Sequence, residues 1–139
     1  MKHILLSIFA VILLSGCKHE IQPEDISKIN GYWEIEKVIL PDGKKKEYKI
    51  NETIDYFKIE NNTGIRKKVT PQLDGKYIDH GTSEKIDVMY TDDKAWLFYN
   101  SGYAHWKEEI ITLSDGELVL KNTNNLEYHY KKPVPFSTK

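Results

Sequence analysis

Two adjacent carboxylates, Glu108 and Glu109, are the residues of this 139-residue sequence best placed for acid–base chemistry. Such a pair acts on a substrate when both groups face one cleft. The surrounding residues predict a β-strand, however, and adjacent strand residues point to opposite faces. If Trp106 and Ile110 face inward, Glu108 does too. Its carboxyl group would then have a raised pKa or be paired, with Arg66 or a lysine. A salt bridge at the rim of a half-exposed strand is the more common arrangement for such a residue.

The histidines and serines offer no further catalytic arrangement. His80, His105 and His129 lack the H-x-H or H-x-x-x-H spacing of a zinc site. The serines of the turn-like segments lack the Gly-x-Ser-x-Gly context of a nucleophile. We therefore predict no enzyme, no metal and no cofactor. His105 stays a candidate for the mouth of a binding cup because it adjoins Trp106 and a Ser-Gly turn.

The only cysteine, Cys17, follows an apolar segment and precedes a polar one. Residues 1–16 start with a basic pair, continue with an apolar run from Ile4 to Leu14, and end in Ser15-Gly16. This is the layout of a secretory signal, and the run is too short to span a bilayer. A buried thiol, a disulfide and a catalytic thiolate are weaker alternatives, because polar chain follows, no second cysteine exists and no base is held nearby.

The tetrapeptide Leu14-Ser15-Gly16-Cys17 resembles the bacterial lipobox. The resemblance implies cleavage before Cys17, a diacylglyceryl group on its sulfur, and an acylated amine carrying a chain such as palmitate. Two or three such chains give a stable membrane anchor. Lys18, in place of the aspartate that retains lipoproteins in the inner membrane, favours an outer membrane destination. The periplasmic and surface faces remain open.

From Gly31 onward, short β-rich segments alternate with turn residues. Asn61-Asn62 and Asp92-Asp93 predict tight hairpins, because Asn and Asp tolerate positive φ. Gly75 predicts a bulge or bend within a strand over residues 72–79. The basic clusters Lys44–Lys46 and Arg66–Lys68 lie beside turn signals, so we expect both at solvated hairpin ends.

Turn signals recurring about every 8–12 residues are typical of an all-β sandwich or barrel. We predict an all-β fold, an antiparallel up-and-down barrel of eight to nine strands, closed or nearly closed. The expected organisation is a cleaved signal peptide over residues 1–16, the lipidated cysteine and a tether over 17–29, the barrel over 30–132, and a tail over 133–139.

The segment INGYWEIEKV, which opens the first strand, resembles the Gly-x-Trp element of lipocalins and other calycins, with Gly31 and Trp33 in the motif positions. The later segments KVTPQLDGKYI, WKEEIITLSDGELVLK and LEYHYKK resemble the lipocalin-like lipoproteins common in Bacteroidetes. The resemblance implies that Trp33 plugs the closed end of the barrel. Lipocalins often cover this tryptophan with an arginine of the last strand. Here Lys131 or Lys132 would take that place without the planar guanidinium.

The sequence feature that best indicates a function is the high proportion of aromatic residues, 12% of the chain. These residues either fill and brace the barrel or line a cup for an apolar or planar ligand. The candidate ligand-binding residues are Trp33, Tyr56, Trp96, Phe98, Tyr103, His105, Trp106, Glu108 and Tyr128.

Two functional hypotheses follow. The first is a membrane-anchored, lipocalin-like binding protein that holds a small hydrophobic ligand. The second is a non-catalytic envelope interaction module with a filled barrel and a protein or glycan partner, such as an assembly component or an inhibitor or immunity protein. With a net charge of −1, the chain has no positive electrostatic field that would attract nucleic acid. An interior cavity above roughly 300 Å³ would favour ligand binding, and a packed centre would favour the module.

Overall fold

The computed structural model describes residues 20–134, so the predicted lipidation site Cys17 lies outside the described residues. The described chain begins with a 3₁₀ helix and continues with strands. The elements are η1 (Pro23–Ile29), β1 (Gly31–Ile39), β2 (Lys45–Glu47), β3 (Ile54–Glu60), β4 (Thr63–Pro71), β5 (Tyr77–Thr91), β6 (Lys94–Asn100), β7 (His105–Leu113), β8 (Glu117–Asn122) and β9 (Glu127–Lys131). Over residues 20–134, no helix is both long enough and apolar enough to cross a bilayer.

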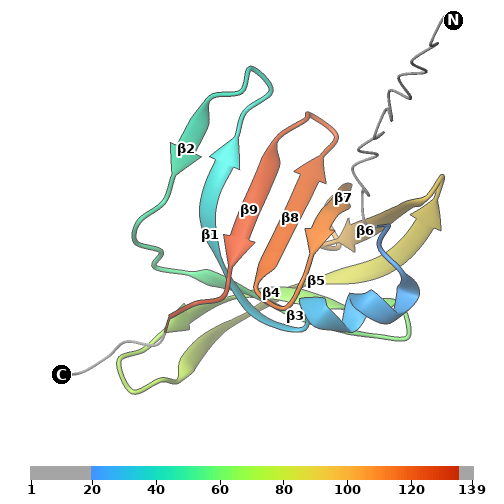
Figure 1. Ribbon diagram of the computed structural model, residues 1–139. Helices are drawn as coiled ribbons and strands as arrows, with labels where there is room; N and C mark the ends of the chain where they lie inside the picture. The colour runs from blue at the N-terminus through green and yellow to red at the C-terminus, as the bar shows by residue number, and fades with distance from the viewer. Residues whose placement is uncertain (1–19, 135–139) are drawn as a thin grey trace, which may run out of the picture.

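The strands form one antiparallel sheet in the order β2-β1-β3-β4-β5-β6-β7-β8-β9, and β1 also pairs with β9. This second pairing closes β1 and β3–β9 into an eight-stranded barrel, with β2 added beside β1 (Figure 1). Consecutive strands of the barrel are neighbours, which is the up-and-down arrangement. The predicted all-β barrel of eight to nine strands is therefore confirmed.

Two tight hairpins follow from residues that tolerate a left-handed backbone. Asn61 and Asn62 join β3 to β4 with φ of 51° and 63°, and Asp92 and Asp93 join β5 to β6 with φ of 50° and 62°. Positive φ at both central residues is the type I′ pattern, whose twist matches that of paired strands. Both predicted hairpins are confirmed.

One end of the barrel is closed by η1, which contacts β3 and β7 (Figure 1). Ile26 and Ile29 of this helix are buried in the core, as is Ile21 just before it. Trp33 of β1 is fully buried beside the helix, and its indole N–H donates to the Ile29 carbonyl oxygen at 2.8 Å. The Lys132 Nζ lies 3.8 Å from the centroid of the Trp33 ring. Of the two lysines expected to cover Trp33, Lys132 has that role.

This contact predicts a modest stabilisation. Replacing Lys132 with methionine keeps most of the aliphatic stem but removes the charge, so we expect a loss of about 1 kcal/mol in the free energy of unfolding. Lys132→Arg supplies a guanidinium that stacks on indole and should preserve or raise stability. Urea unfolding of the two variants measures the difference. Equal midpoints for Lys132→Met and wild type would contradict the cation–π contribution.

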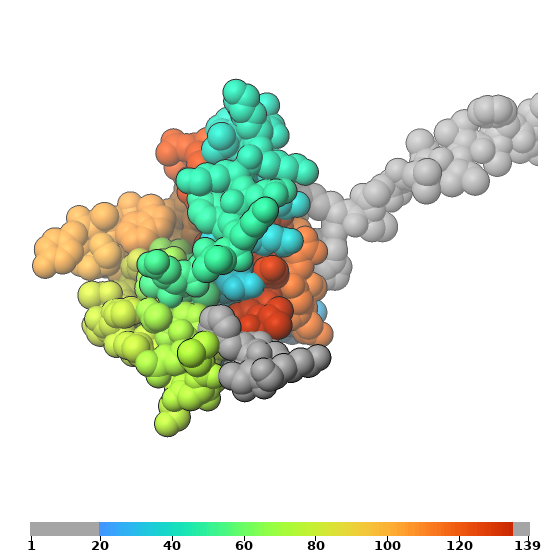
Figure 2. Space-filling model, turned by 90° about the vertical axis from the view of Figure 1, so that its left-hand side faces the viewer, coloured from blue at the N-terminus to red at the C-terminus, as the bar shows by residue number. Residues whose placement is uncertain are grey.

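The opposite end is open because β1 leaves β3 early. β1 pairs with β3 only over Gly31–Trp33, and its residues Glu34–Ile39 pair with β9, while Lys37–Ile39 also pair with β2. Above Trp33, the barrel wall between β1 and β3 is therefore split. The loop regions 40–53, 72–76 and 101–104 stand apart around this end in Figure 2.

Candidate ligand-binding site

The register of the strands turns a set of polar side chains toward the barrel interior. Phe57, a fully buried residue of β3, is paired with Arg66 of β4, and Arg66 is paired with Glu84 of β5. Directly paired residues lie on the same face of an antiparallel sheet, so both charged residues share the inner face with Phe57. One step further along, Asp55 is paired with Lys68 in the same way.

Arg66 is the centre of this interior cluster. Its Nε and Nη2 atoms donate to Glu84 at 3.1 and 3.2 Å, a bidentate pair. Its Nη1 lies 3.6 Å from Glu108, and its guanidinium carbon lies 4.4 Å from the centroid of the Tyr99 ring. The Arg66 side chain is only 12% exposed. The expectation that Arg66–Lys68 form a solvated hairpin end is therefore wrong for Arg66, because strand alternation points it inward.

Glu108 of β7 faces the same interior and is 5% exposed. The expected rim salt bridge on a half-exposed strand is thus not what forms, and the carboxyl group lies beside Arg66 and Tyr99 inside the barrel. Burial raises the pKa of Glu108, although the Arg66 charge and the Tyr99 hydroxyl act in the opposite direction. Burial also raises the pKa of Tyr99 well above the ordinary value, so its hydroxyl remains a donor. The interior therefore combines a permanent cation with a carboxyl group that protonates easily.

The raised pKa of Glu108 predicts a pH-dependent stability. The folded protein binds this proton more tightly than the unfolded chain does, so its stabilising contribution is complete below the ordinary carboxyl pKa of 4.5. The contribution is lost as the pH rises toward the folded pKa. Glu108→Gln mimics the protonated form and lacks this titration. From about pH 4 to about pH 8, wild type should therefore lose stability relative to Glu108→Gln.

The measurement is urea unfolding of both proteins across this pH range. Other titrating groups are shared by the two proteins, so their contributions cancel in the difference between the two curves. Parallel curves of stability against pH would show that Glu108 titrates as an ordinary carboxyl group.

The split between β1 and β3 opens onto an interior pocket of about 210 Å³. Its walls come from strands far apart in the sequence that meet at the closure of the barrel. The apolar and aromatic part of the lining consists of Trp33, Ile35, Val38, Tyr48, Ile54 and Tyr128. Below it the barrel is filled, since Phe57, Leu97, Leu118 and Leu120 are fully buried. The pocket is thus a shallow cup and does not extend through the barrel.

The polar end of the cup is formed by Asp55, Lys68 and Tyr130. The Asp55 carboxylate is 2% exposed and forms an ion pair with the Lys68 ammonium, whose side chain is 54% exposed. Burial, together with the carboxylates of Asp55 and Glu108, raises the pKa of Tyr130 well above its ordinary value. The cup therefore presents a carboxylate, an ammonium group and a protonated phenol to an occupant.

The structure divides the predicted site residues into three groups. Trp33 and Tyr128 line the cup, and Glu108 and Trp106 face the interior beside it. Tyr56, Trp96 and Phe98 alternate with inward-facing residues and lie on the outer surface, where Lys67 covers the Tyr56 ring and Lys107 covers the Trp96 ring. Tyr103 and His105 are exposed at the turn between β6 and β7.

The polar end of the cup, formed by Asp55, Lys68 and Tyr130, was not among the site residues predicted from the sequence. A signal for two of them was present in the printed residues. The apolar residues Phe57 and Ile59 mark the inner face of β3, and the same alternation places Asp55 on that face. Pairing through the Asn61-Asn62 hairpin then sets Lys68 opposite Asp55. Among residues 20–134, no group of three or more His, Cys, Asp or Glu side chains is arranged to hold a metal ion.

The barrel, its helical plug and its Gly-x-Trp start define a lipocalin-like fold, and comparison with known proteins agrees. The family described as lipocalin-like domain matches residues 29–120, so the chain belongs to the lipocalin-like domain family. A lipocalin-like protein from Bacteroides uniformis is similar in structure, with a TM-score of 0.47, 11% identity, and 76% of this chain and 98% of that chain covered.

An uncharacterized protein from Bacteroides eggerthii is also similar in structure, with a TM-score of 0.46 and 14% identity. It covers 75% of this chain, and 98% of that chain is matched. No curated protein matches the sequence.

Proposed function

We propose that this protein binds a small molecule in the cup between β1, β3 and β9 and is held at a membrane through lipidated Cys17. The observation that carries the binding proposal is the composition of the cup. Aromatic and aliphatic side chains surround a cavity of about 210 Å³, and the Asp55–Lys68 ion pair lies at one end of it. Mostly apolar walls with a few convergent polar groups are characteristic of ligand sites.

The size of the cup indicates the class of ligand. Its volume is below the roughly 300–1,000 Å³ of sites that enclose drug-sized ligands. The filled barrel beneath it leaves no room for a long acyl chain. The best fit is a compact, mainly hydrophobic molecule, such as one ring, with one polar group that hydrogen-bonds with the Asp55 carboxylate or the Lys68 ammonium.

Mass spectrometry of protein purified from its native envelope tests this proposal. Wild type should carry a small bound molecule that organic extraction releases. Asp55→Asn should lose most of it, because the ion pair inside the cup is broken. Asp79→Asn is the matched control, since Asp79 also pairs with a β4 lysine, Lys67, but on the outside. A bare wild-type protein whose cup is filled by its own side chains in a crystal structure would refute the proposal.

Support for the membrane anchor comes from the sequence. The signal-like segment before Cys17 and the resemblance to the lipobox both favour lipidation. Lys18 after the cysteine favours an outer membrane location. Cys17→Ala should give an uncleaved, unlipidated chain whose electrophoretic mobility and partitioning into detergent both differ from those of wild type. Unchanged partitioning and unchanged electrophoretic mobility would refute the anchor.

A second candidate function, an envelope interaction module, is favoured by a different observation. Apolar side chains stand fully or largely exposed on loops around the open end, with Ile50 at 89%, Leu73 at 74% and Tyr103 at 102%. These side chains lie on three separate loops at the same end of the barrel, where a protein or glycan partner could contact them together. Replacing all three with serine should abolish cross-linking to a specific envelope partner while the Asp55-dependent ligand remains bound. If the triple variant still cross-linked to the same partner, these loops would not be the binding surface.

A further inference from the structure

The position of Glu20 limits how the barrel can sit on its membrane. Glu20 lines a surface pocket together with Asp92 and Lys94 of the β5–β6 hairpin and Glu109 of β7. It follows Cys17 by three residues. A fully extended chain spans at most about 3.6 Å per residue, so the Cα atom of Cys17 lies within about 11 Å of that of Glu20.

The barrel stays close to this point. Immediately after Glu20, the buried residues Ile21, Ile26 and Ile29 fix the chain to the closed end of the barrel. Cys17 is therefore attached by a short link to a rigid position. An acyl chain in the bilayer holds its cysteine at the level of the lipid headgroups. A lipidated Cys17 would hold the β5–β6 turn close to that level.

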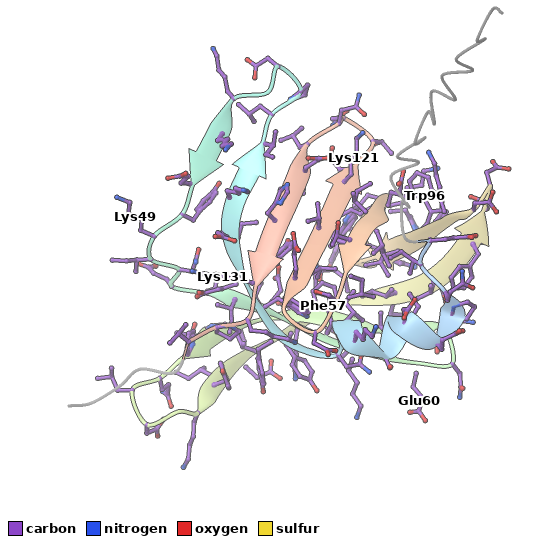
Figure 3. The ribbon with its side chains drawn as sticks, viewed as in Figure 1. Lys49, Phe57, Glu60, Trp96, Lys121 and Lys131 are labelled. Atoms are coloured by element: carbon purple, nitrogen blue, oxygen red, sulfur yellow. The ribbon has the colours of Figure 1, made fainter. Side chains whose placement is uncertain are left out.

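The outer surface beside this point has a composition suited to lipid headgroups. We define the anchor-side face as Met89, Lys94, Trp96 and Lys107. Trp96 is paired with Met89 on one side and with Glu109 on the other, so these side chains share the outer face. The Lys107 Nζ lies 4.5 Å from the Trp96 ring centroid, and Met89 is 48% exposed. Figure 3 shows Trp96 on this side of the barrel.

Tryptophan and lysine are enriched where proteins meet the bilayer interface. Tryptophan lies at headgroup level, and lysine stems cover apolar surface while their ammonium groups reach water. Acidic residues border the same area, namely Glu20, Asp92, Asp93 and Glu109. They balance the lysines, so attraction to anionic lipid is not the driving force. The contact depends on the short link and on burial of the Met89 side chain and of the part of the Trp96 ring that remains exposed.

We propose that the anchor-side face lies on the bilayer that holds lipidated Cys17, with the β4–β5 turn directed away from it. The proposal rests on the lipidation proposed above. β5 separates the two regions: Met89 lies near its membrane end, and Leu73 lies beyond its other end, more than about 30 Å away as measured along the paired strand β4. Figure 1 shows the β4–β5 and β5–β6 turns on opposite sides of the molecule. The binding cup would then receive its ligand from the aqueous phase.

Fluorescence quenching tests this orientation on the full lipidated chain. Lipidation blocks Cys17, so Met89→Cys and Leu73→Cys each provide one free thiol for a bimane label. The proteins are reconstituted in phosphatidylcholine vesicles that contain a nitroxide-headgroup lipid. Quenching at position 89 should exceed quenching at position 73 several-fold, and adding anionic phosphatidylglycerol should leave the ratio unchanged. Equal quenching, or stronger quenching at position 73, would overturn the orientation.

A longer link is the matched control. Inserting about 15 Gly and Ser residues between His19 and Glu20 lets the barrel move about 20 Å from its anchor, so the ratio should fall toward one. An unchanged ratio would contradict the role of the short link. Flotation separates the two proposals. A wild-type chain that does not float with vesicles refutes lipidation and this inference together, whereas a floating chain with equal quenching refutes the orientation alone.

Discussion

Gly64→Ala is expected to destabilise the barrel by about 3 kcal/mol or more, the upper part of the range for overpacked cores. A Cβ atom at position 64 would lie 2.0 Å from the Lys58 carbonyl oxygen and 2.7 Å from the Ile59 Cα atom. These are backbone atoms, so no side-chain rotation relieves the clash. β3 and β4 would have to separate at the hairpin that places Asp55 opposite Lys68. We therefore expect the binding cup to be lost together with stability.

Gly116→Ala is the matched control, because a Cβ atom there meets nothing within 4 Å. This variant should unfold within about 0.5 kcal/mol of wild type. Urea unfolding followed by tryptophan fluorescence reports on both, since Trp33 lies in the core. If Gly64→Ala and Gly116→Ala had the same midpoint, the close approach of β3 and β4 would have no energetic importance.

The alternation of apolar residues and the turn residues between them were enough to predict the barrel. They were not enough to predict its strand boundaries. Gly75 was expected to mark a bulge or bend within a strand; it does form a bend, but this bend lies in the turn between β4 and β5. The bulge occurs at Gly81 instead, with φ of 79°, where the register with β4 shifts. The local sequence around Gly81 resembles a turn, but continued pairing with β4 carries β5 through it as one strand.

The closed end was predictable from the Gly-x-Trp motif, and the polar interior was not. The motif and the family resemblance together identified Trp33 as the residue at the closed end. They also predicted that Lys131 or Lys132 would lie over its ring, and Lys132 makes this contact. The inner cluster depends on cross-strand register, which a run such as Arg66-Lys67-Lys68 does not reveal by itself. Lys67 points outward to Asp79, while its neighbour Arg66 points inward to Glu84. A shift of one residue along a strand therefore decides whether a charged side chain lies on the surface or in the interior.

The second large effect is expected from Arg66→Met. Methionine approximates the length of the arginine stem but removes the cation that pairs with the buried Glu108 carboxylate, and it also leaves Glu84 without its bidentate donor. Removing one member of a buried ion pair typically costs about 3–5 kcal/mol, because the remaining charge is desolvated and uncompensated. We expect a loss of this size at neutral pH, measured by urea unfolding. Lys67→Met on the outer face of the same strand should cost far less, because its ion pair with Asp79 lies at the surface and is screened by water.

The pH dependence of this loss identifies its cause. Without the guanidinium, Glu108 should protonate even more readily, so acid conditions should reduce the penalty of Arg66→Met. Glu108→Gln should do the same at neutral pH, because the double variant Arg66→Met/Glu108→Gln carries no uncompensated charge at position 108. The double variant should therefore be more stable than Arg66→Met alone. If the two substitutions were additive, Arg66 would stabilise the barrel by packing on Tyr99 and pairing with Glu84, and its 3.6 Å approach to Glu108 would be incidental.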